Sequence, residues 1–418
     1  MFRKLINPIL VFPLCLYINS QEALLSKSNN NIEEILEKNE TPIFLDYSKI
    51  DNLIIKNNQE LKSLENLVKS STFNLSSEIA KRYPSLDLQV NGFPQYVAGK
   101  NYNSNSITTK TSQFSTNPSL TLRWDIINPL RGNDIAIAKD NYKIAKNNFE
   151  IKRKDLIVEA RLRYHNLQKS YQDIKNQKFA VDLSRTILTD SKSKFDAGIG
   201  TKFEVLEADA QLSRDQLLLN EKKIQHRINK IALKEILNIK ENIDIKEDQK
   251  IIGFWNHKLN KNINYGLENN LSLKNINLRR SITNKQANNF LNANKPTIFI
   301  SNRFSSSFTK GEASTISVDS SETGSSYSNA ISLNLAWNIF SGGRNKNSYK
   351  SLKAEAEAEE YSYNNLENVL KTNISDAYLN LKLNEEKILS SLKEISSTEE
   401  SLRLARLRYD VGISTLKD

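Results

Sequence analysis

The sequence contains very little cysteine, glycine and proline. Of its 418 residues, 1 is cysteine, 12 are glycine and 8 are proline. A single cysteine excludes an internal disulfide framework and any metal site built from several thiolates. Glycine and proline are the usual interruptions of helices and the usual residues of tight turns, so their scarcity favours long helices over an all-β chain.

Catalytic and metal-binding patterns are also missing. The three histidines, His165, His226 and His257, are far apart and lack the spacing of metal ligands. The sequence has no G-x-x-x-x-G-K-[ST] loop that could bind a nucleotide phosphate. We therefore expect no enzyme, no cofactor and no metal.

The formal net charge of +11 suggests a nucleic-acid-binding helical protein as one alternative. The lysines, however, alternate with glutamate and aspartate along the helical stretches, which is typical of a solvated face.

The N-terminus also argues against a nucleic-acid-binding protein. Arg3 and Lys4 precede an apolar run over 5–18, followed by a polar stretch, which is the pattern of a secretory signal peptide cleaved after Ser20. The run is too short for a membrane-spanning helix, and Cys15 lies inside it in surroundings that disfavour lipidation.

The rest of the chain is a duplication. Five landmarks recur in the same order at offsets of 212 to 214 residues, which chance does not explain. The matched landmarks are Asn57–Leu61 with Asn269–Leu273, Pro84 with Pro296, Trp124 with Trp337, Tyr164 with Tyr378, and Gly198 with Gly412.

Each copy has the same order of elements. An amphipathic helical stretch, 48–81 or 264–293, precedes two runs in which apolar and polar residues alternate with the period of a strand. A long stretch without glycine or proline follows, and it is expected to form a coiled-coil helix of roughly 100 Å. The predicted organisation starts with a signal peptide over 1–20 and a linker over 21–46. A first repeat over 47–239 has strands at about 84–97 and 114–127 and a long helix at about 133–197. After a linker over 240–263, a second, incomplete repeat over 264–418 has strands at about 296–308 and 327–340 and a long helix at about 344–411.

The strands have features of outer-membrane strands. They are about ten residues long, they carry Leu, Ile, Val and Trp on one face and polar residues on the other, and Trp124, Trp337 and Phe340 lie near strand ends. A soluble sandwich shows a similar alternation, but this chain is exported. Four strands cannot close a barrel, and open edges are costly in lipid. Two chains would give a filled eight-stranded barrel and three would give twelve strands with a lumen, which the polar inner face favours.

The duplicated unit, the "YPSL" entry to the first strand and the repeated "F/Y-D-x-G-I-x-T" phrase together resemble the TolC-like outer-membrane efflux proteins. The resemblance covers about 45–418 and implies a mainly α fold with membrane β: four strands per chain contributing to a shared trimeric β-barrel, continued by an α-helical coiled-coil tunnel. It implies a homotrimer in the outer-membrane lipid with a periplasmic extension. Such a duct would serve a tripartite efflux pump or a type I secretion system, together with a periplasmic adaptor and an inner-membrane transporter. Transport through this chain would be passive, with energy supplied by a partner.

A periplasmic coiled-coil adaptor or scaffold is the alternative function. An adaptor would carry one helical hairpin between the halves of a lipoyl-like β module, whereas this chain shows two hairpins and no such module.

The repeated phrase falls where each long helix must turn back. Glycine permits positive φ at a tight turn, and threonine can cap the returning helix. A plain helix-hairpin turn is one interpretation, and the resemblance implies the other, a periplasmic tip that contacts the adaptor. The candidate tip residues are Gly198, Gly200, Thr201, Gly412 and Thr415.

Acidic residues follow the turn. Glu204 and Glu207 share one helix face by their i, i+3 spacing, and Asp418 matches Glu204 at the repeat offset of 214. Ordinary acids at a helix N-terminus, favoured by its dipole, are one interpretation. The resemblance implies instead that these carboxylates line a narrow entrance and attract cations.

Since the chain stops at Asp418, about 35 residues of a second returning helix are missing relative to the first repeat, by the count 239 − 204. We therefore expect a truncated family member whose last long helix lacks its return partner.

Overall fold

The computed structural model describes residues 43–102, 108–245, 255–315, 318–411 and 413. The chain forms two compact units. Unit 1 comprises Met1–Gln59 and Lys154–Ile251, and unit 2 comprises Glu60–Arg153 and Ile252–Asp418. One helix, α4 (Arg131–Asp196), runs from unit 2 into unit 1.

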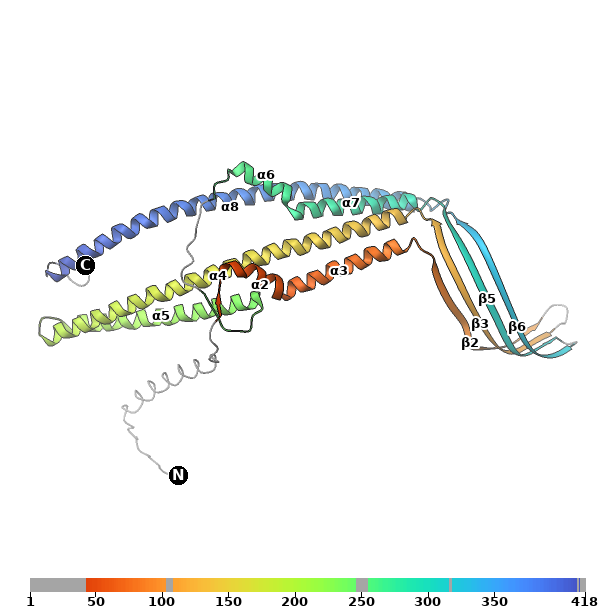
Figure 1. Ribbon diagram of the computed structural model, residues 1–418, viewed down its shortest axis with the longest axis horizontal. Coiled ribbons are helices and arrows are strands. Elements are labelled where there is room, and N and C mark those ends of the chain that lie inside the picture. The colour runs from red at the N-terminus through yellow and green to blue at the C-terminus, as the bar shows by residue number, and fades with distance from the viewer. Residues whose placement is uncertain (1–42, 103–107, 246–254, 316–317, 412, 414–418) are drawn as a thin grey trace, which may run out of the picture. The chain divides into compact units, whose positions relative to one another are not determined.

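Unit 2 contains four long strands and the helices that enter and leave them (Figure 1). In this unit one helix precedes the first strand pair and two helices precede the second, and each pair is followed by a long helix. The elements are α3 (Gln59–Ala80), β2 (Ser85–Tyr102), β3 (Thr108–Ile127) and the first part of α4, then α6 (Leu259–Asn269), α7 (Leu271–Asn292), β5 (Thr297–Thr315), β6 (Val318–Ala336) and α8 (Arg344–Asp410).

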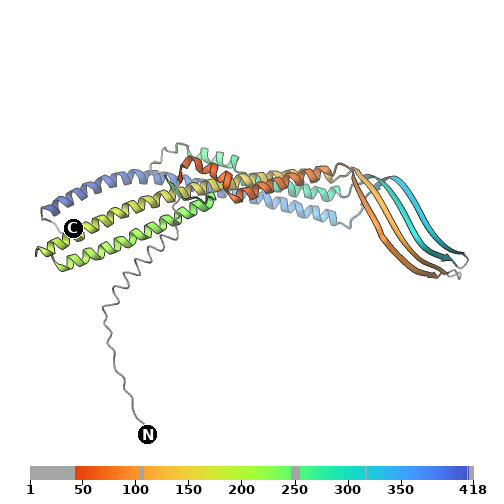
Figure 2. The same cartoon turned by 60° about the horizontal axis from the view of Figure 1, so that its bottom comes forward.

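The four strands form one antiparallel sheet in the order β2-β3-β5-β6, and they curve together along their length (Figure 2). Strands β2 and β6 are therefore the edges of the sheet. All four strands are longer than the alternating sequence pattern predicts, because pairing continues into the polar stretches toward both hairpin turns. Cross-strand backbone hydrogen bonds do not require apolar side chains, so the pattern alone underestimates strand length.

Unit 1 is built around the α4–α5 hairpin. Its elements are β1 (Ile43–Leu45), a short 3₁₀ turn η2 (Tyr47–Lys49), α2 (Ile50–Asn57), the second part of α4, α5 (Lys202–Leu237) and β4 (Ile243–Ile245). Strands β1 and β4 pair in parallel and lie in stretches that the sequence analysis treats as linkers. The core of the unit consists of side chains that are completely or almost completely buried: Ile50, Ile54, Tyr164, Leu167, Leu233, Leu237 and Ile243.

The helical stretch before each strand pair is divided in two, where the sequence predicted one continuous stretch. The first break is at Asn58 (φ −64°, ψ 125°) and the second is at Asn270 (φ −71°, ψ 117°), and these two residues are 212 apart, which is the repeat offset. Asn270 accepts a hydrogen bond from the Leu273 amide, and Asn58 donates one to the Ile236 carbonyl. Asparagine is a favoured N-cap, which explains the break at Asn270, whereas the Asn58 side chain bonds a distant carbonyl of α5.

Helix α7 is held on two sides within unit 2 by polar contacts. Toward α4, Lys285 forms an ion pair with Asp140, whose carboxylate also accepts from Ser281 at 3.1 Å. Toward α8, Lys353 donates to Asn284 at 2.7 Å. Asparagines add further cross-helix bonds, one of them between Asn147 and Asn275 at 2.8 Å. Sliding of α7 along its neighbours would break these bonds and leave part-buried polar groups without partners, which costs free energy.

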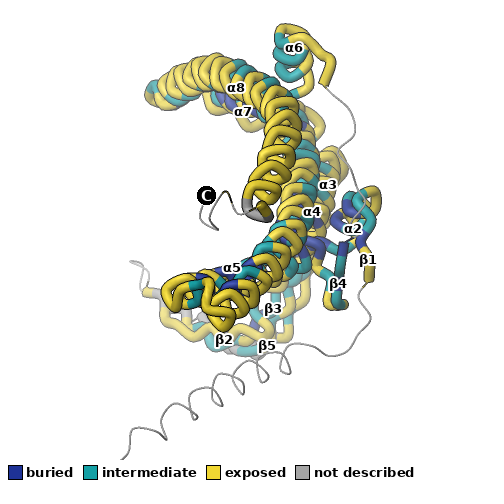
Figure 3. Tube along the Cα trace, turned by 90° about the vertical axis from the view of Figure 1, so that its left-hand side faces the viewer, coloured by how far each residue is buried: buried dark blue, intermediate teal, exposed yellow. Residues whose placement is uncertain are grey.

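The far part of α8 is solvent-exposed. Every residue from 386 to 408 is exposed, whereas the part of α8 near the strands has intermediate and buried positions against α7 (Figure 3). Large apolar side chains are among the exposed ones, including Ile388, Leu392 and Ile395. Within the described residues, this stretch of α8 is a helix without a packing partner.

Candidate functional site

One face of the four-stranded sheet is polar, and cross-strand pairing sets which side chains share it. Ser301 lies opposite Ser332 and Ser305 lies opposite Ser328, and each pair of hydroxyls is hydrogen-bonded at 2.8 Å. The other face is apolar at the corresponding rungs, where Leu88 is opposite Leu120. The apolar side chains of this face are largely exposed in the single chain: Leu86, Leu88, Leu120, Ile331, Leu333 and Leu335 are between 38% and 73% exposed. Such a surface needs an apolar environment outside the chain.

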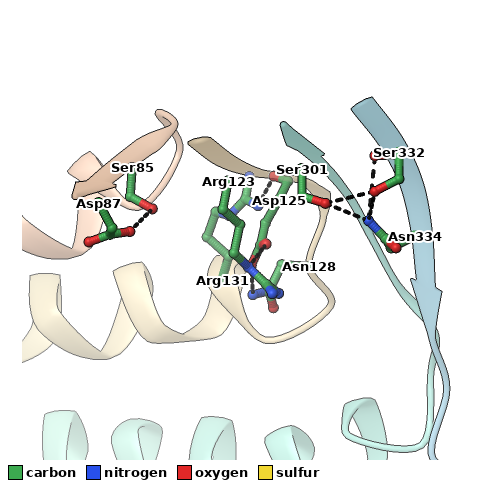
Figure 4. A network of polar contacts seen from close by, with 9 residues as sticks. All are labelled: Ser85, Asp87, Arg123, Asp125, Asn128, Arg131, Ser301, Ser332 and Asn334. Atoms are coloured by element: carbon green, nitrogen blue, oxygen red, sulfur yellow. Dashed lines mark hydrogen bonds and ion pairs between the residues drawn. The ribbon is translucent and has the colours of Figure 1, made fainter. Parts of the chain in front are cut away.

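Charged side chains gather on the polar face where the strands meet the helices (Figure 4). The Arg123 Nε donates to Asp125 Oδ1 at 3.0 Å, and the Arg123 guanidinium lies 3.7 Å from the centre of the Phe299 ring. Arg131, at the start of α4, donates to the Asp125 backbone carbonyl. Arg123 is therefore held both by a carboxylate and by an aromatic face, which is a rigid arrangement for a guanidinium.

In each repeat, a tryptophan forms a hydrogen bond across the junction between helix and strand. The Trp124 Nε1 donates to the Arg82 carbonyl at 3.0 Å, and the Trp337 Nε1 donates to the Asn294 carbonyl at 2.7 Å. Arg82 and Asn294 are again 212 residues apart. The sequence pattern indicates that both tryptophans lie near strand ends, but it does not predict these hydrogen-bond partners. The two equivalent tryptophans indicate that each indole N–H needs an acceptor, but the sequence does not indicate which backbone carbonyl supplies it.

The first helix-hairpin tip closes α4 with a Schellman turn. Gly198 has φ 77°, the Ile199 amide bonds the Lys194 carbonyl at 3.0 Å, and the Gly198 amide bonds the Phe195 carbonyl at 2.9 Å. This is the geometry in which a left-handed glycine satisfies the last carbonyls of a helix. The positive φ predicted for Gly198 is confirmed.

Helix α5 begins with a capping box. The Thr201 hydroxyl accepts from the Glu204 amide at 3.2 Å, and the Glu204 carboxylate accepts from the Thr201 amide at 3.0 Å. The predicted cap by Thr201 is confirmed. The carboxylate of Glu204 is thus directed at its own helix N-terminus, whereas the exposed Glu207 has neither an ion pair nor a hydrogen bond among the described side chains.

Apolar side chains are exposed at this tip. Ile199 is 78% exposed and Phe203 is 68% exposed, next to Gly200 and Thr201. At the second phrase the Ile413 amide bonds the Arg408 carbonyl at 2.9 Å, which is the counterpart of the bond from Ile199 to Lys194. Gly412, Thr415 and Asp418 lie outside the described residues.

Within the described parts of the chain, no cluster of His, Cys, Asp and Glu side chains is arranged to hold a metal ion. Among the same residues, no helix has the length and apolar character needed to cross a bilayer.

The described residues thus form a sheet with one polar and one apolar face, and long helices follow its strand pairs. The family model for outer membrane efflux proteins matches residues 52–238 and 263–418, so the chain belongs to this family. Its members are passive outer-membrane channels and not enzymes, as the sequence predicted.

Solved structures of channels share the fold. CmeC, the outer membrane channel of Campylobacter jejuni, is 18% identical, with 92% of this chain and 82% of that chain covered and a TM-score of 0.69. The outer membrane protein VceC of Vibrio cholerae is 14% identical, with 88% and 87% covered and a TM-score of 0.70. CusC, whose crystal structures describe transmembrane channel formation, is 16% identical, with 91% and 86% covered and a TM-score of 0.69. No curated protein sequence matches this chain.

Proposed function

We propose that this chain is one third of an outer-membrane exit duct. Three copies form a twelve-stranded barrel whose polar face lines the lumen and whose apolar face contacts lipid, and the helices extend the duct into the periplasm. The duct serves a tripartite efflux pump or a type I secretion system, in which a periplasmic adaptor and an inner-membrane transporter supply selection and energy.

The observation that carries this proposal is the open four-stranded sheet. Its faces are polar and apolar, and among the described residues of the single chain no strand pairs with the outer sides of its edges β2 and β6. In lipid, each unpaired backbone group at an edge costs several kcal/mol, so a membrane sheet must close. Twelve strands close with a lumen, whereas eight would be filled by side chains. The family membership supports the same conclusion.

The helix tips are the proposed adaptor contact. Gly198, Gly200 and Thr201 form the described tip, where Ile199 and Phe203 offer exposed apolar surface for a partner. Gly412 and Thr415 would form the second tip by the repeat. The entrance carboxylates proposed to face the passage are Glu204, Glu207 and Asp418, and the free carboxylate of Glu207 makes it the leading one.

Two measurements test the proposal. Detergent-extracted, full-length protein should have the mass of three protomers by light scattering, and it should open ion-conducting channels in planar bilayers. A stable monomer that conducts nothing would contradict the duct. Deleting the gene and measuring which compounds accumulate, or which protein is no longer secreted, then separates the efflux role from the secretion role.

A further inference from the structure

The uncharged part of the β2–β3 hairpin's apolar face ends, away from the helices, at an aromatic pair. Tyr96 lies opposite Phe114 in the register, and their ring centres are 5.0 Å apart. Alternate residues of a strand share one face, so Phe114 is on the same face as Trp124, which lies at the helix end of β3. From one of these aromatic residues to the other, no residue of β3 on this face is charged: Phe114, Thr116, Pro118, Leu120, Leu122 and Trp124.

The length of this uncharged part matches the thickness of a membrane band. Phe114 and Trp124 are 10 positions apart, by 124 − 114. At about 3.4 Å per residue this is roughly 34 Å along the strand. A tilt of about 35–45°, as in outer-membrane barrels, turns it into roughly 25 Å across the membrane, which is about the height of their apolar band. In the proposed duct, whose helices extend into the periplasm, Tyr96 and Phe114 therefore lie at the outer border of the bilayer.

Two lysines lie beyond this border on the same face. Lys100 is directly opposite Lys110, and each is 4 residues past the aromatic pair, by 100 − 96 and 114 − 110. Both lysines are exposed. Neither forms an ion pair within the part of the chain that the structure describes. Like charges directly opposite each other in a sheet are destabilising, so this rung would be stabilised by an anion from outside the chain.

No acidic residue of β2 or β3 lies on this face. The acidic residues of these two strands are Asp87 and Asp125, and the alternation places both on the polar face. The two lysine charges are therefore not compensated by a carboxylate of their own hairpin.

Hydroxyl groups lie between the aromatic pair and the lysines. The Tyr96 and Ser112 hydroxyl oxygens are 2.8 Å apart, and Ser112 is two residues from Lys110 on the same face. One hydroxyl donates to the other, so the second keeps an O–H for an acceptor outside the chain. Two ammonium groups and this hydroxyl are donors suited to phosphate oxygens.

We propose that Lys100, Lys110 and the hydroxyl pair of Tyr96 and Ser112 bind the phosphate of a lipid head group in the outer leaflet. This proposal rests on the proposed duct. Four residues correspond to roughly 13 Å along a strand, or about 10 Å across the membrane when the strand is tilted. Lysine side chains extend along apolar surface while their charged ends stay in water, so they reach the head-group layer from this height. The aromatic rings below contact the acyl chains, which a free anion would not require.

The test is native mass spectrometry of the detergent-extracted, full-length protein with added lipid. Phosphatidic acid is the probe, and phosphatidylcholine, whose head group has no net charge, is the comparison. The native protein should bind phosphatidic acid at least about tenfold more tightly, as two lysines near an anionic lipid would give. Lys100→Gln together with Lys110→Gln should remove this preference. An unchanged preference in that double variant would overturn the proposal.

The matched control is Lys387→Gln with Lys393→Gln, which removes the same charge from the exposed far part of α8. It should keep the native preference, and an equal loss would show that only the total charge matters, which also overturns the site. Millimolar inorganic phosphate should not displace the lipid; complete displacement would assign the site to free phosphate instead. Light scattering and bilayer conductance of the same samples test the duct separately. A trimeric, conducting double variant with native lipid preference overturns only the lipid site, whereas a monomeric, silent native protein overturns the duct.

Discussion

The two glycines of the described tip are constrained in different ways. Gly198 has φ 77°, but nothing lies within 4 Å of the position where a Cβ would be added. Gly200 has no positive φ, yet a Cβ there would lie 3.0 Å from the Phe195 amide nitrogen and 3.1 Å from the Lys194 carbonyl carbon. The first glycine is required by backbone conformation and the second by space.

Substitutions at Gly198 should therefore follow backbone preference rather than side-chain size. Asparagine tolerates left-handed backbone, whereas a β-branched residue does not, so Gly198→Val should destabilise the turn by about 1–2 kcal/mol and Gly198→Asn by less. The measurement is hydrogen exchange of the Ile199 and Gly200 amides, which bond the Lys194 carbonyl. Equal exchange in the two variants would contradict the conformational argument.

Local chemistry made the tip predictable from sequence. The positive φ of Gly198 and the cap of Thr201 depend on residues within a few positions of each other, and both predictions are confirmed. The partner of Trp124 was not predictable in this way, because Arg82 is 42 residues distant in sequence and contributes only a backbone carbonyl. Any residue could supply that carbonyl, so the sequence carries no trace of it.

At the scale of elements, the tryptophan bonds join each helix end to the strand that returns beside it. Trp124→Phe keeps an aromatic ring but removes the N–H, and the Arg82 carbonyl loses its donor. We expect a loss of about 1 kcal/mol in the free energy of unfolding, and a similar loss for Trp337→Phe at the second junction. Chemical unfolding monitored by circular dichroism measures both. Trp255→Phe is the control, since among the described residues Trp255 has only a ring contact with His257. Losses no larger than in this control would contradict the junction role.

Asp140 links α4 to α7 and should make stability depend on pH. Burial of this carboxyl acts to raise its pKa, but hydrogen bonds and charge from Lys285, together with Lys143 and Ser281, outweigh burial and hold the pKa below its ordinary value of 3.8. A lowered pKa in the folded state means that the ionised Asp140 carboxylate stabilises the fold. This stabilisation is fully present at pH values above the pKa of the unfolded state, and it is lost as the pH falls through the pKa of the folded state.

Asp140→Asn should thus be less stable than the native protein at pH 7, by roughly 1–3 kcal/mol, because Lys285 loses its counter-charge. The difference should shrink as the pH falls below 3.8, where the native carboxyl also takes up a proton. Urea unfolding at neutral and acid pH measures this. Asp182→Asn is a suitable control, since its partner Arg185 and the carboxylate are both well exposed. A difference that stays constant with pH would show that Asp140 acts only through packing.

The sequence pattern predicted the order of elements in both repeats, because hydrophobic period and the lack of glycine are properties of long segments. It failed where single polar residues decide, as at Asn58 and Asn270, which divide the helical stretches. It also missed the β1–β4 pair, whose two strands of 3 residues each are too short to show a period.

At the scale of the whole molecule, charges are distributed unevenly along the proposed passage. At the helix end of the polar sheet face, Arg123 and Asp125 neutralise each other at 3.0 Å, and Arg303 and Asp87 add one charge of each sign. The neighbouring rungs are mainly serine, threonine and asparagine. The barrel should therefore discriminate little between cations and anions, so ion selectivity should arise at the tip instead.

Glu207 is the residue on which that selectivity should depend. Its carboxylate is exposed and lacks a partner among the described side chains, so three copies at the entrance would attract cations. Glu207→Gln should lower the cation-to-anion permeability ratio by about two- to fivefold at low salt, and by less as salt screens the charges. Reversal potentials in planar bilayers measure the ratio.

Glu204→Gln is the matched control one turn away, because its side chain is bonded to the Thr201 amide and glutamine preserves the capping box. It should change the ratio less. Identical reversal potentials for the native channel and Glu207→Gln would remove Glu207 from the entrance, and a larger effect at Glu204 would mean that the capping carboxylate, rather than the free one, faces the passing ions.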